Sequence, residues 1–350
     1  MHARRAEASA GRRAPWPATA RSGVEGPVTF AALFEEFLAI SAARGRSPTT
    51  IHGYRTAIAG FWLPAIGELE LGELSAHRLD MLYAALLTKE TPASPATVRK
   101  YHAILSAALN QAVKWQWIAS NPARLATLPA LEHHALVTPT PAQVRALIQG
   151  CTEVSDVLGM FVLTAAVTGC RRGELAALRW RDFSDGELHV RGSAYNVGGV
   201  RGEKQTKTGR QRRVTVAGEV TLRLEEWRAR CEDAASTAGV AYGEDAHLFS
   251  NDPDGAAPVN INSVSTSFRR VATRLGLDTV HFHSLRHFAA TQLISAGVDP
   301  RTAASRLGHA NPSMTLRIYA HSTRETEQRA AEISSRVLVD TTPPAPGDGP

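Results

Sequence analysis

The sequence is poor in cysteine and has no long hydrophobic run. Its three cysteines, Cys151, Cys170 and Cys231, are too few and too widely spaced for a disulfide framework or a Cys-x-x-Cys metal site, and we expect them to be buried apolar residues. The longest strongly apolar stretch, residues 157–167, is far shorter than the roughly 18 residues of a membrane-spanning segment. The basic N-terminus also lacks the apolar segment of a signal peptide. We therefore expect a cytoplasmic protein with no membrane association.

The overall composition is that of a soluble globular protein, with 21% charged and 43% hydrophobic residues. At about 100 to 200 residues per domain, a chain of this length suggests two domains. The formal net charge is +6, and residues 201–213 alone carry six basic residues and one acidic residue. Taken alone, this basic run only modestly favours a polyanionic partner over a solvated charged loop.

The two ends of the sequence, residues 1–26 and 340–350, show no apolar period and are rich in small residues and proline. Segments of this composition cannot bury enough apolar surface to fold. We expect residues 1–26 to form a disordered basic arm and residues 340–350 to form a flexible tail.

Helix starts are marked by a hydroxyl or Asx residue followed by proline, because the side chain caps free N–H groups and the proline presets φ. Five such pairs occur, namely Ser47-Pro48, Ser94-Pro95, Thr140-Pro141, Asp299-Pro300 and Asn311-Pro312. Between residues 27 and 122, four apolar stripes with a helical period follow one another. They are Phe30, Leu33, Phe34 and Phe37; Ile51, Tyr54, Ile58 and Phe61; Leu79, Leu82, Tyr83 and Leu86; and Val98, Tyr101, Leu105, Leu109 and Ala112. We interpret residues 27–122 as a helical domain with these side chains in its core.

The helical pattern lapses after residue 122, and prolines punctuate residues 123–139, which we interpret as a linker. A second domain, residues 140–339, begins with the pattern of a capping box at Thr140 and Gln143. Within it, residues 187–190 and 212–216 alternate apolar and polar side chains as short strands do. The expected fold class is mainly α with a small β-sheet (α+β).

Four separated segments of the second domain carry residues suited to phosphate chemistry. They are TGCRRGEL at 168–175, TKTG at 206–209, HSLRH at 283–287, and LGH at 307–309 with Tyr319 ten residues after the last histidine. Each motif is weak alone, because such short patterns arise by chance. In this order and spacing they resemble the catalytic signature of the tyrosine recombinases, the phage integrase family. The resemblance spans residues 140–335, and the preceding helical domain resembles that family's SAM-like core-binding domain.

The resemblance implies phosphoryl transfer at a DNA phosphodiester without a metal or a cofactor. Tyr319 is the implied nucleophile, which forms a 3′-phosphotyrosyl bond while the 5′-oxygen leaves. Arg171 and Arg286 are the implied clamp, because guanidinium groups stay charged and donate paired hydrogen bonds to phosphate oxygens. Lys207 is the implied proton donor to the leaving oxygen.

Two histidines complete the implied set of six catalytic residues. His283 accepts the phenolic proton, since its unperturbed pKa lies near neutrality, and His309 hydrogen-bonds the phosphate, although these two roles could be exchanged. Glu174 and His287 are expected to orient and pack neighbouring groups. A plainer interpretation of Arg171 is an ion pair with Glu174.

The implied partner is double-stranded DNA with specific core sites. A homotetramer assembled on DNA is also implied, because exchanging both strands of two duplexes needs four active sites, and accessory directionality factors are allowed. The side chains expected to bind DNA belong to the basic run, namely Lys204, Arg210, Arg212 and Arg213. Lys204 also competes with Lys207 as the proton donor.

Two features depart from the familiar phage enzymes. Residues 1–26 do not resemble the small arm-site-binding domain that many of them carry, so the control of direction stays open. Residues 192–205, ahead of the implied catalytic lysine, form a long stretch with Gly198, Gly199 and Gly202. We expect this stretch to be a mobile hairpin that orders on DNA.

Other functions fit parts of the sequence. A metal-dependent nuclease could use His281, His283 and His287, but Arg286 places a fixed charge beside the cation and no Glu completes a His-Glu-x-x-His site. A non-catalytic two-domain DNA-binding protein has no need of the phenol and the proton donor. A type IB topoisomerase shares the chemistry, but the helical clamp and the two boxes at 283 and 309 look more like those of an integrase. Integration or excision of a phage or mobile element is preferred to Xer-like chromosome-dimer resolution, because the basic arm and the tail are additions to the compact form of a resolvase.

Overall fold

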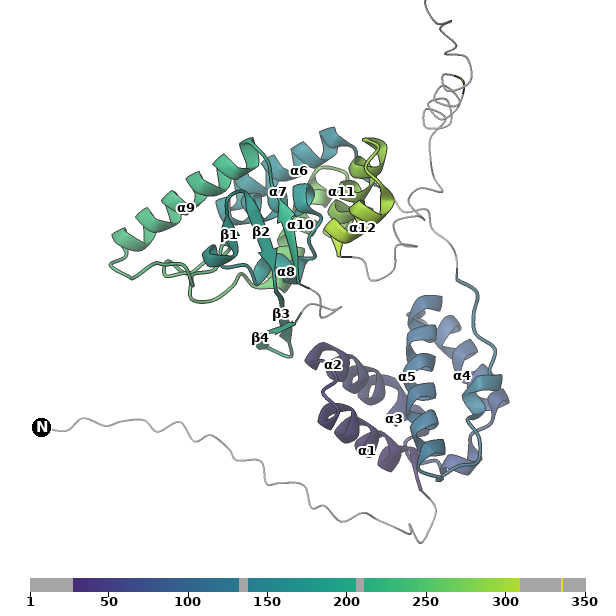
Figure 1. Cartoon of the computed structure of the whole chain (residues 1–350). Coiled ribbons are helices and arrows are strands. Elements are labelled where there is room, and N and C mark those ends of the chain that lie inside the picture. The colour runs from purple at the N-terminus through teal and green to yellow at the C-terminus, as the bar shows by residue number, and fades with distance from the viewer. Residues whose placement is uncertain (1–27, 132–137, 206–210, 309–334, 336–350) are drawn as a thin grey trace, which may run out of the picture. The chain divides into compact units, whose positions relative to one another are not determined.

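The structure is a computed structural model that describes residues 28–131, 138–205, 211–308 and 335. The chain divides into two compact units, residues 1–132 and 133–350 (Figure 1). In the described ranges the first unit is helical, and the second combines helices with small antiparallel sheets. The expected fold class is therefore confirmed.

The first unit is a set of short helices whose starts are capped as the sequence predicts. The Oγ of Ser47 accepts a hydrogen bond from the N–H of Thr50 at 3.3 Å, and the Oγ of Ser94 accepts one from the N–H of Thr97 at 3.2 Å. The elements are α1 (Phe30–Ala43), α2 (Pro48–Ala57), the π-helical turn η1 (Ile58–Trp62), α3 (Leu63–Ile66), the 3-10 turn η2 (Leu71–Glu73), α4 (Ala76–Thr88), α5 (Pro95–Lys114) and the 3-10 turn η3 (Pro122–Leu125).

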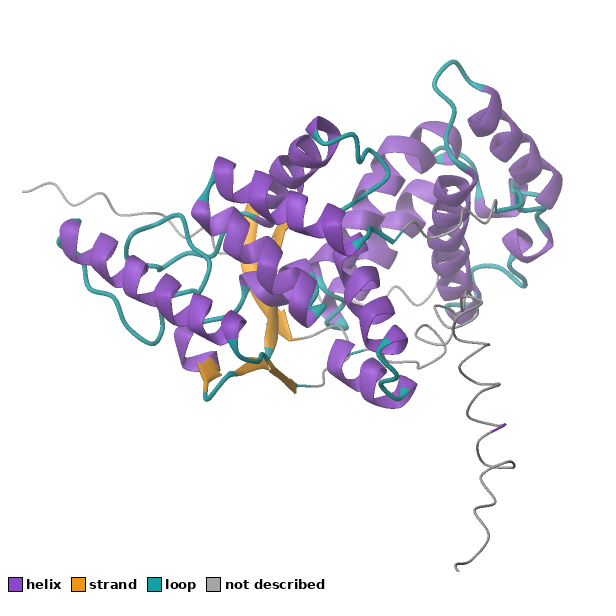
Figure 2. Ribbon diagram, turned by 90° about the horizontal axis from the view of Figure 1, so that it is seen from above, coloured by secondary structure: helices purple, strands orange, loops and turns teal. Residues whose placement is uncertain are grey.

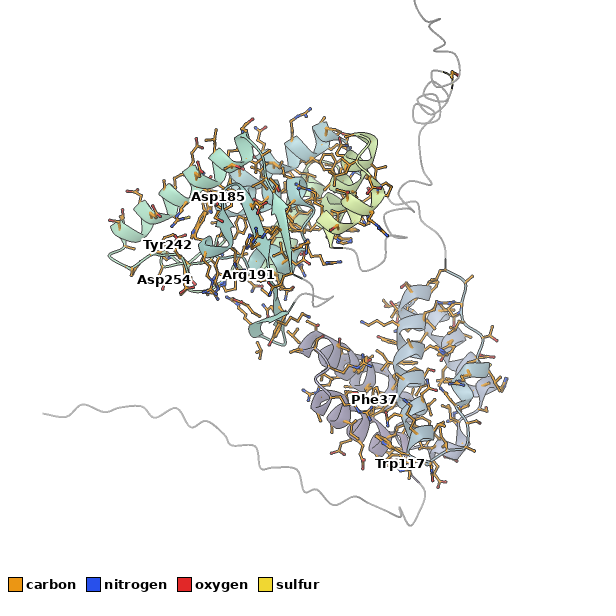
Figure 3. The ribbon with its side chains drawn as sticks, in the orientation of Figure 1. Phe37, Trp117, Asp185, Arg191, Tyr242 and Asp254 are labelled. Carbon is orange, nitrogen blue, oxygen red and sulfur yellow. The ribbon has the colours of Figure 1, made fainter. Side chains whose placement is uncertain are left out.

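The core of the first unit is built from the predicted apolar stripes. Phe30, Leu33 and Phe34 of α1 are at most 1% exposed, and Phe37 on the same helix is also buried (Figure 3). All four stripes contribute buried side chains to one hydrophobic cluster. The helical period was therefore a sound guide to the core, because each stripe presents one face to its neighbours.

The first unit extends beyond residue 122, where we expected the linker to begin. Asn121 caps η3, Ala123 is 1% exposed in the core, and Leu128 packs against the same cluster. Arg99 also donates a hydrogen bond to the carbonyl of Pro129 at 2.9 Å. Prolines marked these residues as irregular, but irregular backbone can still pack when its polar groups find partners.

The first helix of the second unit begins at the predicted capping box. The N–H of Thr140 donates to Gln143 Oε1 at 2.8 Å, and the N–H of Gln143 donates to Thr140 Oγ1 at 3.2 Å. The helices are α6 (Pro141–Val154), α7 (Asp156–Thr168), α8 (Arg172–Ala176), the 3-10 turn η4 (Trp180–Asp182), α9 (Glu219–Thr237), α10 (Ile261–Arg274), α11 (Ser284–Ser295) and α12 (Pro300–Leu307). Asp299 caps α12 as expected, whereas the pair Asn311-Pro312 lies outside the described residues.

Two antiparallel ladders lie between these helices (Figure 2). The first has the order β1 (Phe183–Ser184), β2 (Glu187–Val190) and β5 (Arg212–Thr215), and the second pairs β3 (Gly192–Val197) with β4 (Val200–Gln205). Only Arg191 separates β2 from β3, and residues 206–211 stand between β4 and β5 in the sequence.

The predicted hairpin at 192–205 is present as β3 and β4. Its two turn residues, Gly198 and Gly199, have φ values of 57° and 82°. Two consecutive positive φ values are typical of a tight two-residue hairpin turn, which glycine adopts without a steric cost. That this hairpin is mobile in the free protein and becomes ordered when DNA binds stays a prediction.

A small cluster fastens α12 to the rest of the second unit. Leu307 is fully buried against Ala289 and Ala290 of α11. A Cβ at Gly169, which follows α7, would lie 2.3 Å from Leu307 Cδ2. The end of α12 is thus held directly against the segment that leads into Arg171.

Candidate active site

Arg171 lies at the start of α8 and is oriented by Glu174. Its backbone N–H and its Nη1 both donate to the Glu174 carboxylate at 2.8 Å. Its Nη2 donates to the carbonyl of Gly308 at 3.0 Å, across 137 residues of sequence. The ion pair that we weighed as an alternative is therefore present. Because each Nη carries two N–H groups, the same ion pair also fixes a guanidinium that keeps donors for another acceptor.

Glu174 is a buried carboxylate, 1% exposed, that is shared by two arginines. Besides Arg171, it accepts a hydrogen bond from Arg212 Nη2 at 2.7 Å. Burial acts to raise the pKa of Glu174, but the bonds and charges of Arg212 and Arg171 outweigh this effect and hold its pKa below the usual value. Glu174 is therefore ionised and positions both guanidinium groups. This is the orienting role that we expected for Glu174 from the sequence.

Arg286 on α11 is the most deeply buried cation of the site, at 3% exposed. Its Nη1 donates to the carbonyl of Gly169 at 2.7 Å, while its Nη2 is buried and has no hydrogen-bond partner among the described residues. Burial, followed by the charge of Arg171, lowers the pKa of Arg286 to about 10. A charged donor that is left buried and unpaired costs free energy, so this position favours an anion as the missing partner.

His283 occupies the position directly before α11, three residues before Arg286, and its side chain makes no capping hydrogen bond. Partial burial, assisted by the charges of His287, Arg286 and Arg171, lowers its pKa to about 4, although the residue as a whole is exposed at the surface. The rings of His283 and His287 meet edge to face, with centroids 4.9 Å apart. His283 is therefore a neutral imidazole at physiological pH, with a nitrogen able to accept a proton.

The third histidine of the nuclease alternative has a different partner. His281 Nδ1 lies 2.6 Å from Arg269 Nη1. In the part of the chain that the structure describes, His, Cys, Asp and Glu side chains do not form any group of three placed to hold a metal ion.

The structure brings together Arg171, His283 and Arg286, which come from two separate motifs. Lys207, Arg210, His309 and Tyr319 lie outside the described residues, and their places in the site stay predictions. Gly308, whose carbonyl binds Arg171, is the residue directly before His309.

The expected DNA-binding side chains fall into different environments. Arg213 is exposed, with a side-chain exposure of 70%, and makes a 3.6 Å ion pair with Glu187. Lys204 on β4 lies with its Nζ 5.9 Å from the centroid of the Tyr195 ring. Both positions are compatible with contact to a phosphate backbone.

Arg212, by contrast, points into the protein and is not a surface contact. Its side chain is 10% exposed, because it packs among Glu174, Cys170 and the end of α12. The signal that could have revealed this is the strand period. Arg212 lies two residues before the fully buried Val214, whereas Arg213 alternates to the outer face.

A second basic region lies beside the site but is electrostatically satisfied. A cavity of about 350 Å³ is lined by Arg179, Arg181 and Arg191, the last of which is labelled near the strands in Figure 3. Each of the three arginines has a carboxylate partner: Glu203, Asp245 and Asp182, respectively. Arg286 has no ion-pair partner among the described residues, so it is the stronger candidate to bind an anion.

Comparison with known proteins identifies the family of this chain. A model of the phage integrase family matches residues 139–326. The chain is 27% identical to the integrase of Mycobacterium phage L5 over 280 residues. The matched region covers 78% of this chain and 71% of that protein. It is 28% identical over 313 residues to the tyrosine recombinase XerC of Herpetosiphon aurantiacus, which covers 87% of this chain and 95% of that protein.

Solved structures show the same fold. The Tn1549 transposon integrase in complex with transposon right end DNA has a TM-score of 0.70 at 20% identity and covers 87% of this chain and 99% of that chain. The lambda integrase tetramer bound to a Holliday junction has a TM-score of 0.65 at 20% identity and covers 84% of this chain and 78% of that chain.

The fixed arginine cluster is suited to binding a phosphate ester through its positive charges. The chain belongs to the phage integrase family, the tyrosine recombinases, whose reaction is site-specific DNA recombination. In the described ranges, none of the helices is long and apolar enough to cross a bilayer.

Proposed function

We propose that this protein cleaves and rejoins DNA through a 3′-phosphotyrosyl intermediate on Tyr319, and that it integrates or excises a phage or mobile element. The observation that carries the chemical part is the unpaired Nη2 of Arg286, buried beside the charge of Arg171. Two guanidinium groups held close together repel each other unless an anion lies between them. A phosphodiester is an anion with two nonbridging oxygens that both groups can bind.

The same pair of arginines stabilises the transition state more than the bound ground state. When the Tyr319 oxygen attacks phosphorus, negative charge accumulates on the nonbridging oxygens of a pentacoordinate phosphate. Donors that are fixed beforehand stabilise this charge without reorganising. Glu174 fixes Arg171, and the Gly169 carbonyl fixes Arg286.

Proton transfers accompany the two bond changes. His283, held neutral by burial, takes the phenolic proton as the phosphorus–oxygen bond to Tyr319 forms. Lys207 gives a proton to the 5′-oxygen as its bond to phosphorus breaks, and His309 hydrogen-bonds the phosphate. The 5′-hydroxyl of another strand then reverses these steps. The phosphotyrosyl bond conserves the energy of the broken linkage, so the reaction needs no metal or nucleotide.

The proposed partners are duplex DNA with core sites and three further copies of this chain. Exchange of both strands of two duplexes requires four nucleophiles, and the similar lambda integrase is a tetramer on a Holliday junction. The first compact unit, whose described part is residues 28–131, is the proposed core-binding domain. Residues 140–339 are the proposed catalytic domain, and Lys204, Arg210 and Arg213 are the proposed DNA contacts of the basic run.

Chromosome-dimer resolution is the second candidate, because a XerC protein matches 87% of the chain. Integration is preferred since the L5 phage integrase matches at nearly equal identity and since residues 1–26 add a basic arm. The core sequences that the protein cleaves distinguish the two candidates. A match to the ends of a mobile element supports integration, and a match to one chromosomal site outside any such element supports resolution.

Covalent capture tests the reaction. The full chain is incubated with a pool of duplexes that carry a randomised core and a nick, so that cleavage releases a short fragment and leaves the protein attached. We expect an adduct that survives SDS, forms equally well with EDTA, and is lost in Arg286→Met. Cleavage that needs a divalent cation and leaves no attached protein supports the nuclease instead. Binding without cleavage supports a non-catalytic DNA-binding protein.

A further inference from the structure

Arg212 occupies the centre of a closed hydrogen-bond network. Its Nη2 donates to Glu174 Oε2 at 2.7 Å and to Cys170 Sγ at 3.4 Å, and its Nε donates to the carbonyl of Arg306 at 2.9 Å. These bonds and a side-chain exposure of only 10% place the guanidinium inside the protein. A planar group with several fixed donors is suited to holding such separate acceptors at once.

The acceptors of Arg212 belong to the two segments that hold Arg171. Glu174 binds the backbone and the Nη1 of Arg171, and the Gly308 carbonyl binds its Nη2. Arg306, whose carbonyl binds Arg212, is two residues before Gly308. Arg212 therefore connects both supports of Arg171 and closes a ring that includes α8, β5 and the end of α12.

Gly308 shows how closely the guanidinium is packed. A Cβ at this position would lie 2.8 Å from Arg212 Nη1 and 2.9 Å from its Cζ. Real Cβ atoms do not approach other atoms so closely, so the contact requires glycine, which also accommodates the φ of +69°. The backbone that leads to His309 thus rests directly against Arg212.

Removing Arg212 has a predictable electrostatic consequence. Glu174 is buried, and Arg212 is the largest influence that opposes the effect of burial on its pKa. Without Arg212, the pKa of this carboxyl rises. Once Glu174 takes up a proton at low pH, it no longer orients Arg171 as an ion-pair partner.

We propose that Arg212 is a positioning residue for DNA cleavage, which orients Arg171 through Glu174 and fixes the end of α12 through the Arg306 carbonyl. This inference rests on the proposed function of the site. It replaces the expectation that Arg212 binds DNA. A displacement of about 1 Å in a catalytic group can cost roughly 100-fold in rate, so the loss of this brace has a large effect on the rate of cleavage.

The test compares Arg212→Met and Arg212→Lys with two other variants. Arg223→Met, on α9, removes one positive charge and one exposed ion pair with Glu219, and it controls for the change in charge. Arg213→Met removes the neighbouring exposed arginine of β5 and shows how the loss of a phosphate contact behaves. Single-turnover cleavage is measured at saturating concentrations of a duplex recovered by covalent capture, and binding is measured across salt concentrations.

For Arg212→Met we expect cleavage about 100-fold slower, with the salt dependence of binding unchanged. As the pH is lowered, its cleavage falls at a higher pH than that of the wild type, in which only protonation of His283 slows the reaction. This upward shift is absent from the double variant Glu174→Gln, Arg212→Met. Arg212→Lys recovers part of the rate, because it keeps the charge beside Glu174 but cannot reach every acceptor. For Arg213→Met we expect weaker binding, with the slope of log K against log salt reduced by about 0.9.

The orientation of Arg171 can also be measured in the free protein, without DNA. In nitrogen-15 spectra of the free protein, the guanidinium signals of Arg171 are expected to broaden in Arg212→Met and to stay unchanged in Arg223→Met. Normal cleavage by Arg212→Met with a reduced salt slope overturns the inference and makes Arg212 a phosphate contact. Unchanged Arg171 signals overturn it too. If the wild-type protein forms no adduct, the proposed function fails, while the spectra still decide the role of Arg212.

Discussion

Arg286 Nη1 donates to the carbonyl of Gly169 at 2.7 Å, although 117 residues separate them in sequence. This bond joins the start of α11 to the segment between α7 and Arg171. It leaves the Nη2 of Arg286 buried and, among the described residues, unpaired. The Nη1 of Arg286 therefore holds the side chain in place, and its Nη2 is left to bind an anion.

Lys207 is expected to protonate the leaving oxygen. Because an alkoxide leaves poorly, Lys207→Ala should slow cleavage of normal DNA by roughly 100- to 10,000-fold. A duplex with sulfur at the 5′-bridging position should restore cleavage, since a thiolate leaves without protonation. The measurement is single-turnover adduct formation on both duplexes. Lys204→Ala is the comparison, and rescue of that variant instead assigns the proton to Lys204.

His283 is expected to make stability depend on pH below neutrality. Burial lowers its folded-state pKa from 6.5 to about 4, so the unfolded chain binds a proton here before the folded chain does. The stabilisation is complete above pH 6.5 and is lost as the pH falls toward 4.

Urea unfolding of the wild type and of His283→Asn measures this contribution. As the pH falls from 6.5 toward 4, the wild type should lose stability relative to the variant. The loss should stay well below the limit of about 1.4 kcal/mol per pH unit, because His283 is exposed and solvent screens its interactions. His287 is present in both proteins and cancels from the difference. A difference that does not vary with pH shows that folding does not lower the pKa of His283.

Gly308→Ala should disturb both the fold and the site. A side chain at φ +69° costs about 1–2 kcal/mol, and the added Cβ displaces Arg212. Gly297→Ala is the matched control, because Gly297 has φ +82° and open space around it. Urea unfolding should show a loss of stability in both variants, with the larger loss in Gly308→Ala. Covalent capture should show a loss of cleavage in Gly308→Ala alone; equal effects of the two variants on cleavage contradict the contact with Arg212.

Local signals in the sequence predicted much of the fold. Ser47, Ser94, Thr140 and Asp299 cap helices where the sequence placed them, because a cap depends on residues three positions apart. Alternation of side chains placed β2 with its exact bounds. The packing of Ala123 beyond the expected boundary was missed, since a short irregular segment has no period to show which face is buried.

The site could be predicted as a set of residues but not as a network. Motif order selected Arg171, His283 and Arg286, which the structure brings together. The roles of Arg212 and of the Gly308 carbonyl depend on contacts across 38 and 137 residues, and such contacts leave no local pattern. The period of β5 could have shown that Arg212 faces inward, but the density of basic residues favoured a DNA contact.

The identity of the residue that holds the cleaved strand is the most direct test of this account. The SDS-stable adduct from wild-type protein is digested, and the peptide that carries the nucleotide is sequenced by mass spectrometry. We predict that the nucleotide is attached to Tyr319, and that Tyr319→Phe binds the same duplex with unchanged affinity but forms no adduct. Attachment to any other residue, or an adduct that persists in Tyr319→Phe, contradicts the account.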